Sequence, residues 1–247
     1  MRLTVLGACG AWPEPGQACS GFLLQHEDFN LVIDLGYATM PRLLMHVDAA
    51  DVDAVFISHG HPDHCADLNP LLRARALAGV PLPPLPVYAP AGAVDAVLRL
   101  DRPEMLAGSY QVVDVEPGAI FEIGPFRTET RLLPHWLPDL GVRLAASGAV
   151  LAYTGDTGPS DEVVNLAVDA DLLLAEATYV DRAPDEAKAY ISTARVAGRQ
   201  AAAAGVGRLL LTHMWPGADR SAFLAAADVE YRGELGVAEP GLQAEIG

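Results

Sequence analysis

The sequence predicts an α/β protein in which helices cover two β-sheets that pack face to face. Short β-branched or Leu-rich runs recur along the whole chain. The amino-terminal part is mostly a strand meander, whereas strands alternate with helix-like segments later. Helices outside two sheets fit this mixture better than one doubly wound sheet does.

Ten segments have the apolar pattern of strands. They are residues 3–6, 21–25, 30–35, 54–58, 111–115, 126–133, 142–145, 150–154, 172–176 and 208–212. The last two are continuous apolar runs, which are typical of strands buried on both faces. The Pro-rich residues 80–86 are expected to form a rigid connection into a further strand.

Six segments between these runs are helix-like. They are residues 40–46, 67–78, 92–100, 159–167, 193–204 and 221–232. For the helix at 193–204, Ser192 is the expected N-cap and Gly205 the expected stop.

Length and charge bound the function. The chain has 247 residues, of which 51% are hydrophobic, so we expect a single domain over residues 1–247 with a substantial core. Asp and Glu number 32 against 16 Lys and Arg, which gives a formal charge of −16. Because a protein with this net negative charge repels polyanions, no large nucleic-acid surface is expected.

Three cysteines, Cys9, Cys19 and Cys65, are too few and too odd in number for a disulfide framework. The first residues lack the long apolar stretch of a signal peptide, and no run approaches a membrane span. We therefore expect a cytoplasmic protein without membrane association.

The strongest chemical signal is the segment Ser58-His-Gly-His-Pro-Asp-His64, which directly follows an apolar strand. Three imidazoles and a carboxylate within six residues form a concentrated set of metal ligands. In an extended stretch, His59 and His61 point the same way. A turn at Pro62 lets Asp63 and His64 swing toward a second point.

Three more potential ligands lie one or two residues past predicted strands, namely His135, Asp156 and His213. Strand ends can meet at one edge of a sandwich, so all of these side chains could converge. Five of the seven histidines belong to this set, which makes a His-rich surface loop the weaker interpretation.

This pattern resembles the metallo-β-lactamase fold superfamily of metal-dependent hydrolases, whose hallmark is His-x-His-x-Asp-His. The hallmark lies at residues 59–64, and the resemblance covers nearly the whole chain. Its other parts are the Leu6-Gly7 turn and residues 32–36, 153–157 and 211–213. The resemblance implies a four-layer αββα sandwich of two mixed sheets with helices outside.

The resemblance also implies two Zn²⁺ per chain, while Mn²⁺ and Fe remain compatible with the same ligands. His59, His61 and His135 would hold one ion; Asp63, His64 and His213 would hold the second; Asp156 would bridge both. Two cations about 3.5–4 Å apart can share a water and depress its pKa, which yields a bridging hydroxide near neutral pH. Asp63 is a catalytic candidate as well, since it could orient that hydroxide.

Within the superfamily, residues 153–157, 172–178 and 211–213 are similar to the ribonuclease Z branch, which includes the tRNA 3′-processing endonuclease and small phosphodiesterases. Ala175 stands where the endonuclease usually has a general-acid His, and Tyr190 where a second His is frequent. Residues 80–111 are short and nearly neutral where the endonuclease has a basic tRNA-gripping arm. These departures weigh against pre-tRNA cleavage.

The sequence therefore favours a dinuclear zinc-dependent phosphodiesterase acting on small phosphodiesters such as cyclic nucleotides. The alternatives are a ribonuclease Z-like endoribonuclease, a thioesterase or lactonase on the same metals, and a metal-binding interaction module without catalysis. The expected partner is a small anionic substrate. Dimers are common among relatives, so a homodimer is compatible with the resemblance, although no residue demonstrates one.

A few more residues are candidates near the substrate. Glu176 and Tyr190 are catalytic candidates, either in support of the ligands or at the leaving group. Asp34, in an apolar strand, would orient a ligand His, with a solvated strand-end role as the alternative. Arg143 and Arg220 could meet phosphate oxygens, and Trp136 and Trp215 could floor a pocket and stack on a base. Surface exposure of the arginines, packing of Tyr190 and cover of the metal site by the tryptophans are the simpler alternatives.

Overall fold

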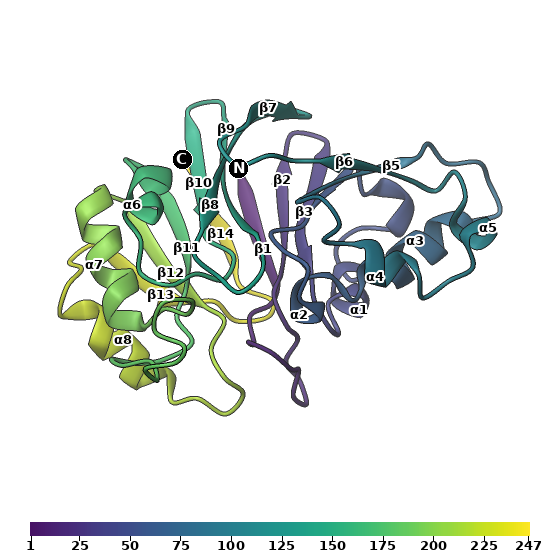
Figure 1. Ribbon diagram of the computed structural model, residues 1–247. Helices are drawn as coiled ribbons and strands as arrows, with labels where there is room; N and C mark the ends of the chain where they lie inside the picture. The colour runs from purple at the N-terminus through teal and green to yellow at the C-terminus, as the bar shows by residue number, and fades with distance from the viewer.

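Two seven-stranded β-sheets pack face to face in the computed structural model, which describes residues 1–247 with the side chain of Pro103 excepted (Figure 1). The first sheet has the strand order β14-β1-β2-β3-β4-β5-β6. Its strands are β1 (Arg2–Gly7), β2 (Gly21–His26), β3 (Phe29–Leu35), β4 (Ala54–Phe56), β5 (Leu85–Ala89), β6 (Tyr110–Asp114) and β14 (Gln243–Glu245). The second has the order β13-β12-β11-β10-β9-β8-β7. Its strands are β7 (Ile120–Ile123), β8 (Phe126–Leu133), β9 (Asp139–Ala146), β10 (Ala149–Tyr153), β11 (Leu172–Glu176), β12 (Arg208–Thr212) and β13 (Glu234–Val237).

Helices form the two outer layers. Those on the first sheet are α1 (Met40–Leu43), α2 (Pro62–Cys65), α3 (Leu68–Ala76), α4 (Asp95–Leu98) and α5 (Pro103–Leu106), with a 3₁₀ turn at Ala49–Asp51. Those on the second are α6 (Asp161–Ala167), α7 (Ala194–Ala204) and α8 (Arg220–Asp228). The four-layer αββα sandwich expected from the sequence is confirmed. In the part of the chain that the structure describes, no helix combines the length and apolar character needed to cross a bilayer.

Both sheets are mixed, and their strand directions explain why distant loops meet. In the second sheet, β8 and β10 both pair antiparallel with β9 and therefore run the same way. The strands β10, β11, β12 and β13 are parallel to one another. The carboxyl ends of β8, β10 and β12 consequently lie at one edge of the sheet. The parallel set β3 to β6 does the same in the first sheet.

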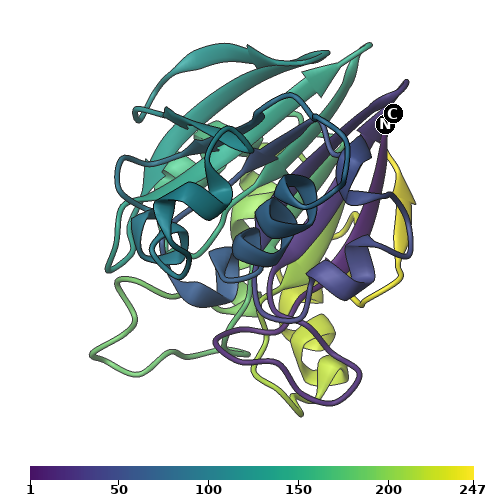
Figure 2. The ribbon, with the colours of Figure 1, turned by 90° about the vertical axis from the view of Figure 1, so that its right-hand side faces the viewer.

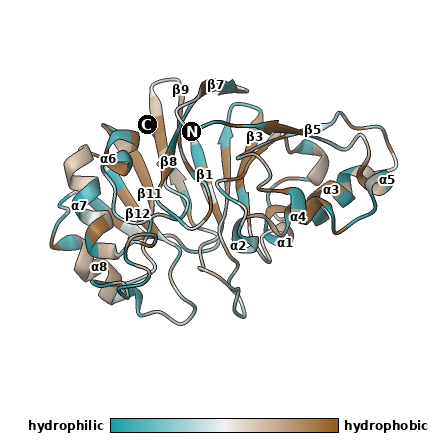
Figure 3. Ribbon diagram, viewed as in Figure 1, coloured by the Kyte–Doolittle hydropathy of each residue, from teal (hydrophilic) through white to brown (hydrophobic). Residues whose placement is uncertain are grey.

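Apolar side chains fill three layers, in agreement with the alternation of strand side chains across each sheet. Figure 3 shows hydrophobic stretches, in brown, along the strands of both sheets. Between the sheets, Phe22 and Tyr153 meet edge-on with ring centroids 5.3 Å apart. On the outer face of the first sheet, α3 contributes Leu68, Leu71 and Leu72 to a separate cluster. On the outer face of the second, alanines of α7 pack against β11 and β12. Small side chains allow that helix to lie close to the strands.

All ten strands expected from the sequence are present, and β8, β11 and β12 have the expected bounds. The Pro-rich segment does lead into a strand, β5. The short edge strands β7, β13 and β14 and the single turn of α2 were not expected. One expectation was wrong: Thr193, and not Ser192, caps α7, because its hydroxyl accepts a hydrogen bond from the backbone N–H of Val196 at 3.1 Å. Gly205 ends α7 in the left-handed conformation at φ 68°, as expected.

Candidate metal centre

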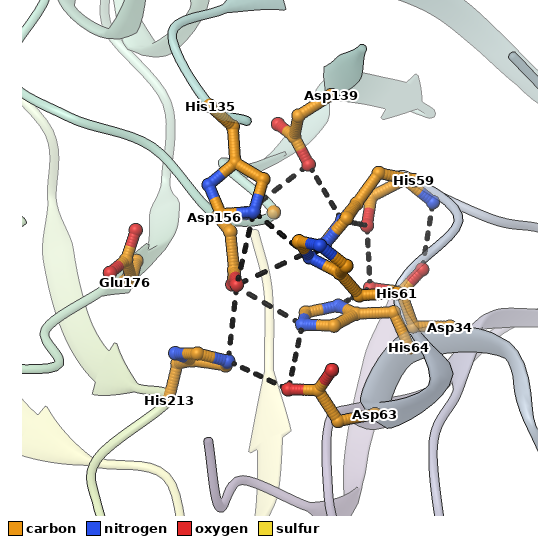
Figure 4. A network of polar contacts seen from close by, with 12 residues as sticks. Asp34, His59, His61, Asp63, His64, His135, Asp139, Asp156, Glu176 and His213 are labelled. Carbon is orange, nitrogen blue, oxygen red and sulfur yellow. Dashed lines mark hydrogen bonds and ion pairs between the residues drawn. The ribbon is translucent and has the colours of Figure 1, made fainter. Parts of the chain in front are cut away.

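The seven predicted ligands converge at the lower edge of the sandwich as drawn in Figure 1, between the ends of the two sheets. His59 and His61 lie in the loop after β4, and Asp63 and His64 lie on α2. The other three follow strands of the second sheet, with His135 after β8, Asp156 after β10 and His213 after β12. Figure 4 shows their side chains pointing toward one another. The expectation that strand ends bring them to one edge is confirmed.

Pro62 divides the hallmark segment into two arms. His61 has extended backbone angles and precedes α2, and Pro62 occupies its first turn, where its fixed φ suits a helix start. The turn closes when the backbone N–H of His64 donates to the carbonyl of His61 at 3.0 Å. The arm before the turn carries His59 and His61, and the turn carries Asp63 and His64. Each arm therefore reaches a different side of the site.

The first group of ligand atoms consists of three imidazole nitrogens and a carboxylate. Nδ1 of His61 lies 3.0 Å from Nε2 of His59 and 3.1 Å from Nε2 of His135. Oδ2 of Asp156 lies 3.9 Å from both of those Nε2 atoms. A tetrahedral Zn²⁺ with bonds of about 2.0–2.1 Å holds its ligand atoms about 3.3 Å apart. The spacing of this group therefore suits a cation of that size.

The second group consists of two imidazole nitrogens and two carboxylates. Oδ2 of Asp63 lies 3.2 Å from Nε2 of His213 and 3.7 Å from Nε2 of His64. It also accepts a hydrogen bond from the backbone N–H of Ala11 at 2.7 Å, which fixes its direction. Oδ1 of Asp156 lies 3.2 Å from Nε2 of His64. The carboxylate of Asp156 thus contributes to both groups.

Two buried carboxylates hold ligand histidines from behind. Oδ2 of Asp34 lies 2.7 Å from Nδ1 of His64, so Asp34 contacts a predicted ligand, as expected. Asp34 is inserted by a bulge in β3 at φ 55°, a conformation that asparagine and aspartate tolerate best among residues with a side chain. Oδ1 of Asp139 lies 3.0 Å from Nδ1 of His59. In each case the carboxylate leaves the opposite nitrogen of the ring for the metal group.

Two other histidines of the cluster, His135 and His213, have neutral partners. Nδ1 of His135 donates to the backbone carbonyl of Tyr190 at 2.9 Å. Nδ1 of His213 lies 2.9 Å from the hydroxyl oxygen of Thr178, which itself donates to Oε1 of Glu176 at 2.7 Å. Because a carbonyl only accepts, the tautomer of His135 is fixed with its Nε2 lone pair toward the cluster.

The donor set fits cations on the evidence of its own unsatisfied atoms. Among the described residues, Nε2 of His64 and Oδ1 of Asp156 are buried without a hydrogen-bond partner, although they lie 3.2 Å apart. When the ring of His64 is neutral, its Nδ1–H donates to Asp34, so Nε2 and the facing oxygen of Asp156 both present lone pairs. An unsatisfied buried acceptor is costly, and a divalent cation between two of them removes that cost.

Burial and nearby charges shift the pKa values of the cluster histidines in opposite directions. Burial lowers the pKa of His59 well below its ordinary value, and burial also lowers the pKa of His61 and His135. Burial alone would lower the pKa of His64 and His213 too, but nearby carboxylates, Asp156 foremost, outweigh burial and raise both. In the metal-free protein, protons on these two rings balance the carboxylates. Bound cations would displace those protons.

The two other catalytic candidates lie behind the ligands. Glu176 is buried to one side of the cluster (Figure 4), where its carboxylate accepts hydrogen bonds from the backbone N–H of Thr157 and Ser192. Its contact to Thr178 favours the supporting role over direct contact with a leaving group. Tyr190 supports His135 through its carbonyl, and its ring lies 5.3 Å from that of Trp136.

Both arginine candidates lie elsewhere. Arg143 alternates with the buried Val142 and Leu144 on β9 and points to the helix side, where it donates to the carbonyls of Leu166 and Val168 at the end of α6. Arg220 pairs with Glu239. The proposed phosphate role of Arg143 is therefore wrong in this structure, and the role proposed for Arg220 has no support from its contacts.

A pocket of about 480 Å³ opens above the cluster. Its floor consists of ligand side chains, and both predicted tryptophans, Trp136 and Trp215, line it. The rest of the wall comes mainly from the segment between β11 and α7, with Tyr179, Glu186 and Ile191 among its residues. Tyr190 is not among the lining residues. The pocket is within the size range of small-molecule sites.

Two supporting residues were not anticipated, Asp139 and Thr178. Asp139 stands at the start of β9, four residues after His135, and it lies beside His59 where the backbone N–H of Leu140 donates to the carbonyl of Ser58 at 3.0 Å and joins β9 to the loop after β4. Thr178 lies two residues after Glu176 on the extended exit from β11, so the two side chains leave the strand on the same side. That spacing is a signal that could have identified Thr178.

Comparison with known proteins identifies the family of this chain. The model of the β-lactamase superfamily domain matches residues 30–214. The probable metallo-hydrolase YhfI of Bacillus subtilis is 31% identical to this chain over 98% of both chains. The crystal structure of YhfI is described as that of a metallo-β-lactamase fold protein. It superposes with a TM-score of 0.90 at 28% identity over 99% of both chains. Ribonuclease Z of Haloferax volcanii is 30% identical over 100% of this chain and 95% of its own. The short form of human tRNase Z has a TM-score of 0.83 at 26% identity, with full coverage of both chains. The chain therefore belongs to the β-lactamase superfamily and has the metallo-β-lactamase fold, with metallo-hydrolases and ribonucleases Z among its relatives.

Proposed function

We propose that this chain is a hydrolase that holds two Zn²⁺ ions and cleaves small phosphodiesters, with cyclic nucleotides as the leading substrate class. One observation carries the proposal: the carboxylate of Asp156 contacts both groups of histidines. Its Oδ1 lies 3.2 Å from Nε2 of His64, and its Oδ2 lies 3.2 Å from Nε2 of His213 and 3.9 Å from the Nε2 atoms of His59 and His135. A carboxylate in this position could serve two cations. His59, His61 and His135 would hold one ion, and Asp63, His64 and His213 the other. When bound, two such ions polarise a phosphoryl group and acidify a water molecule.

The chain's own residues set the position of the reacting group. The floor of the pocket is the ligand cluster, so a substrate that enters must place its most polar atoms there. Asp63 is fixed by the backbone N–H of Ala11 at 2.7 Å, which makes it the carboxylate best placed to accept a proton beside the ions. The aromatic wall excludes water from one side of that floor.

A second candidate, endoribonuclease activity, is favoured by the similarity to ribonuclease Z proteins. Three features of this chain argue against it. The formal charge of −16 opposes a long polyanion, and no Lys or Arg is found among the residues that line the pocket. Ala175 and Tyr190 also replace the two histidines expected of a tRNA-processing enzyme, and neither supplies an imidazole. A thioesterase or lactonase would use the same ions on a carbonyl group.

Metal analysis and a substrate panel test the proposal. We expect about two Zn²⁺ per purified chain and turnover of bis-p-nitrophenyl phosphate and cyclic AMP, both lost on dialysis against a chelator. The panel also contains a thioester, a lactone and a pre-tRNA. Turnover restricted to the thioester or the lactone would contradict the phosphodiesterase, and efficient cleavage of the pre-tRNA would favour the ribonuclease.

Variants of the ligands separate an enzyme from a metal-binding module. His64→Ala and Asp156→Ala should each retain less than one metal per chain and lose turnover. His46→Ala, which changes a histidine outside the cluster, is the matched control and should behave as the wild type. Full metal content and full activity in the ligand variants would refute the site, and two bound metals without turnover of any substrate would favour a module.

A further inference from the structure

The wall of the pocket differs in chemistry from its floor. Trp136 directly follows the predicted ligand His135, and Trp215 closely follows the predicted ligand His213. Both indoles therefore lie next to the cluster and line the pocket. Ring contacts hold them in place: Trp136 lies 5.3 Å from Tyr190, and Trp215 lies 5.0 Å from Trp12. A flat aromatic group that reaches the floor therefore meets aromatic surfaces on the wall.

Glu186 is the charged residue of the wall outside the ligand cluster. It lies in the segment between β11 and α7, where both cations pair with a different carboxylate. Arg182 lies 3.6 Å from Asp185, and Lys188 lies 3.3 Å from the same Oδ1 atom of Asp185. Glu186, which is exposed to solvent, thus adds a negative charge to the wall, and no Lys or Arg of the described residues lines the pocket.

This charge pattern predicts which substrates fit. A single phosphate is accommodated by the ions on the floor, but a second phosphate would meet a carboxylate on the wall and no cation. A carboxylate accepts hydrogen bonds from the exocyclic amino groups of guanine and adenine and from the ring N1–H of guanine. Stacking on indoles is tolerant of base type, so discrimination falls to Glu186.

We propose that the pocket selects a phosphodiester with one phosphate and an aromatic base that carries an exocyclic amino group, and that Glu186 determines this specificity. The inference rests on the proposed phosphodiesterase function and adds its substrate class. A comparison of substrates with guanine and with hypoxanthine tests this specificity most directly, because the two bases differ only in the exocyclic amino group. Adding a 5′-phosphate to a dinucleoside monophosphate probes the charge of the wall.

The experiment measures kcat/KM of the metal-loaded wild type and of Glu186→Gln. The wild type should prefer the guanosine over the inosine 3′,5′-cyclic monophosphate by about tenfold, as expected for a hydrogen bond to a charged acceptor. Glu186→Gln should reduce this preference to about twofold or less. A 5′-phosphate should lower kcat/KM in the wild type, and Glu186→Gln should recover about fivefold of that loss.

Asp185→Asn is the matched control, because it removes the neighbouring carboxylate that pairs with Arg182 and Lys188. It should leave both substrate preferences as in the wild type. Equal preferences in Glu186→Gln and the wild type would overturn the inference, as would turnover of bis-p-nitrophenyl phosphate with neither cyclic nucleotide cleaved. No turnover of bis-p-nitrophenyl phosphate by the wild type would instead refute the proposed function, and the inference with it.

Discussion

Asp34 and His64, thirty residues apart in the chain, form a buried contact in which Oδ2 lies 2.7 Å from Nδ1. The same oxygen accepts hydrogen bonds from the hydroxyls of Tyr153 at 2.7 Å and Ser58 at 2.9 Å. Oδ1 accepts from the backbone N–H of Ser58 at 2.8 Å. One carboxylate therefore ties together β3, the loop after β4, α2 and the end of β10, and sets the tautomer of a predicted ligand.

Asp34→Asn should weaken metal binding while it preserves the backbone. Asparagine tolerates the left-handed φ of this position, but its amide would donate to Nδ1 of His64 and leave a proton on Nε2, toward the ions. We expect a loss of about 10–100-fold in metal affinity. Competition with a chromophoric chelator measures it. Asp53→Asn, where an exposed carboxylate accepts from the backbone N–H of Asn30, is the control and should bind metal normally.

Thr178→Val should weaken the support of His213, on the other side of the metal centre from Asp34. Valine matches the shape of threonine but removes the hydroxyl between Glu176 and His213. Nδ1 of His213 is then buried without its partner, which we expect to cost about 1–3 kcal/mol of unfolding free energy and to lower the affinity for one of the two ions. Chemical denaturation and metal titration report the two effects. Thr178→Ser keeps the hydroxyl and should retain both the stability and the metal affinity of the wild type. If it does not, the hydrogen bonds that link His213 to Glu176 through this hydroxyl do not support the site.

Glu176 should make the stability of the metal-free protein fall as the pH rises. Burial raises its pKa from near 4.5 to about 8, and the charge of Asp156 adds to the shift. A raised folded-state pKa means that the stabilising contribution is complete below about 4.5 and is lost as the pH rises through about 8. In metal-free protein this loss is on the order of 2–4 kcal/mol.

Glu176→Gln should therefore flatten the pH profile. Urea midpoints of metal-free protein, measured between pH 5 and 8.5, should fall less steeply for the variant than for the wild type. The variant should also be less stable at pH 5, because the amide has one acceptor oxygen and its NH2 group must face the backbone N–H of either Thr157 or Ser192. Parallel profiles for the two proteins would show that Glu176 does not titrate in this range. Metal loading should shrink the difference, because the ions offset the charge of Asp156.

Gly36→Ala tests the packing of α2 against β3. A Cβ at this glycine would lie 1.8 Å from the backbone carbonyl oxygen of Asp63, so α2 would have to move. We expect a loss of about 3 kcal/mol or more in unfolding free energy, together with weaker metal binding. Gly118→Ala adds the same methyl group where nothing lies within 4 Å, at φ 77°. Strain at that φ should cost about 1–2 kcal/mol without any effect on the metals.

The site was predictable to the extent that it depends on local rules. Ligands placed just past strand ends met at one edge because the strand directions agree, and Asp34 was found because a charge in an apolar strand needs a partner. The position of Asp139 depends on the contact between the start of β9 and the loop after β4, two segments far apart in the chain, which a single sequence does not encode locally. The error at Arg143 was avoidable, because alternation with the buried Val142 and Leu144 places it on the helix side of β9.

The edges of the sheets were harder to predict for a different reason. The strands β13 and β14 have four and three residues, too few to show alternation, and their pairing partners fix them as strands. β14 returns from the second sheet to pair with β1, so the backbone near Gly247 lies beside that near Met1 (Figure 2). Such a contact between distant parts of the chain leaves no local signature.

The contact between Asp63 and His213 spans 150 residues, and it has a kinetic consequence. A loop of that length closes only when both sheets are assembled and docked, so the complete pair of ligand groups forms late in folding. Metal supply should therefore leave the refolding rate of this protein nearly unchanged and act instead on its unfolding rate. Ions that bind only the finished sandwich oppose its opening, and occupancy of the site sets how long the folded state survives.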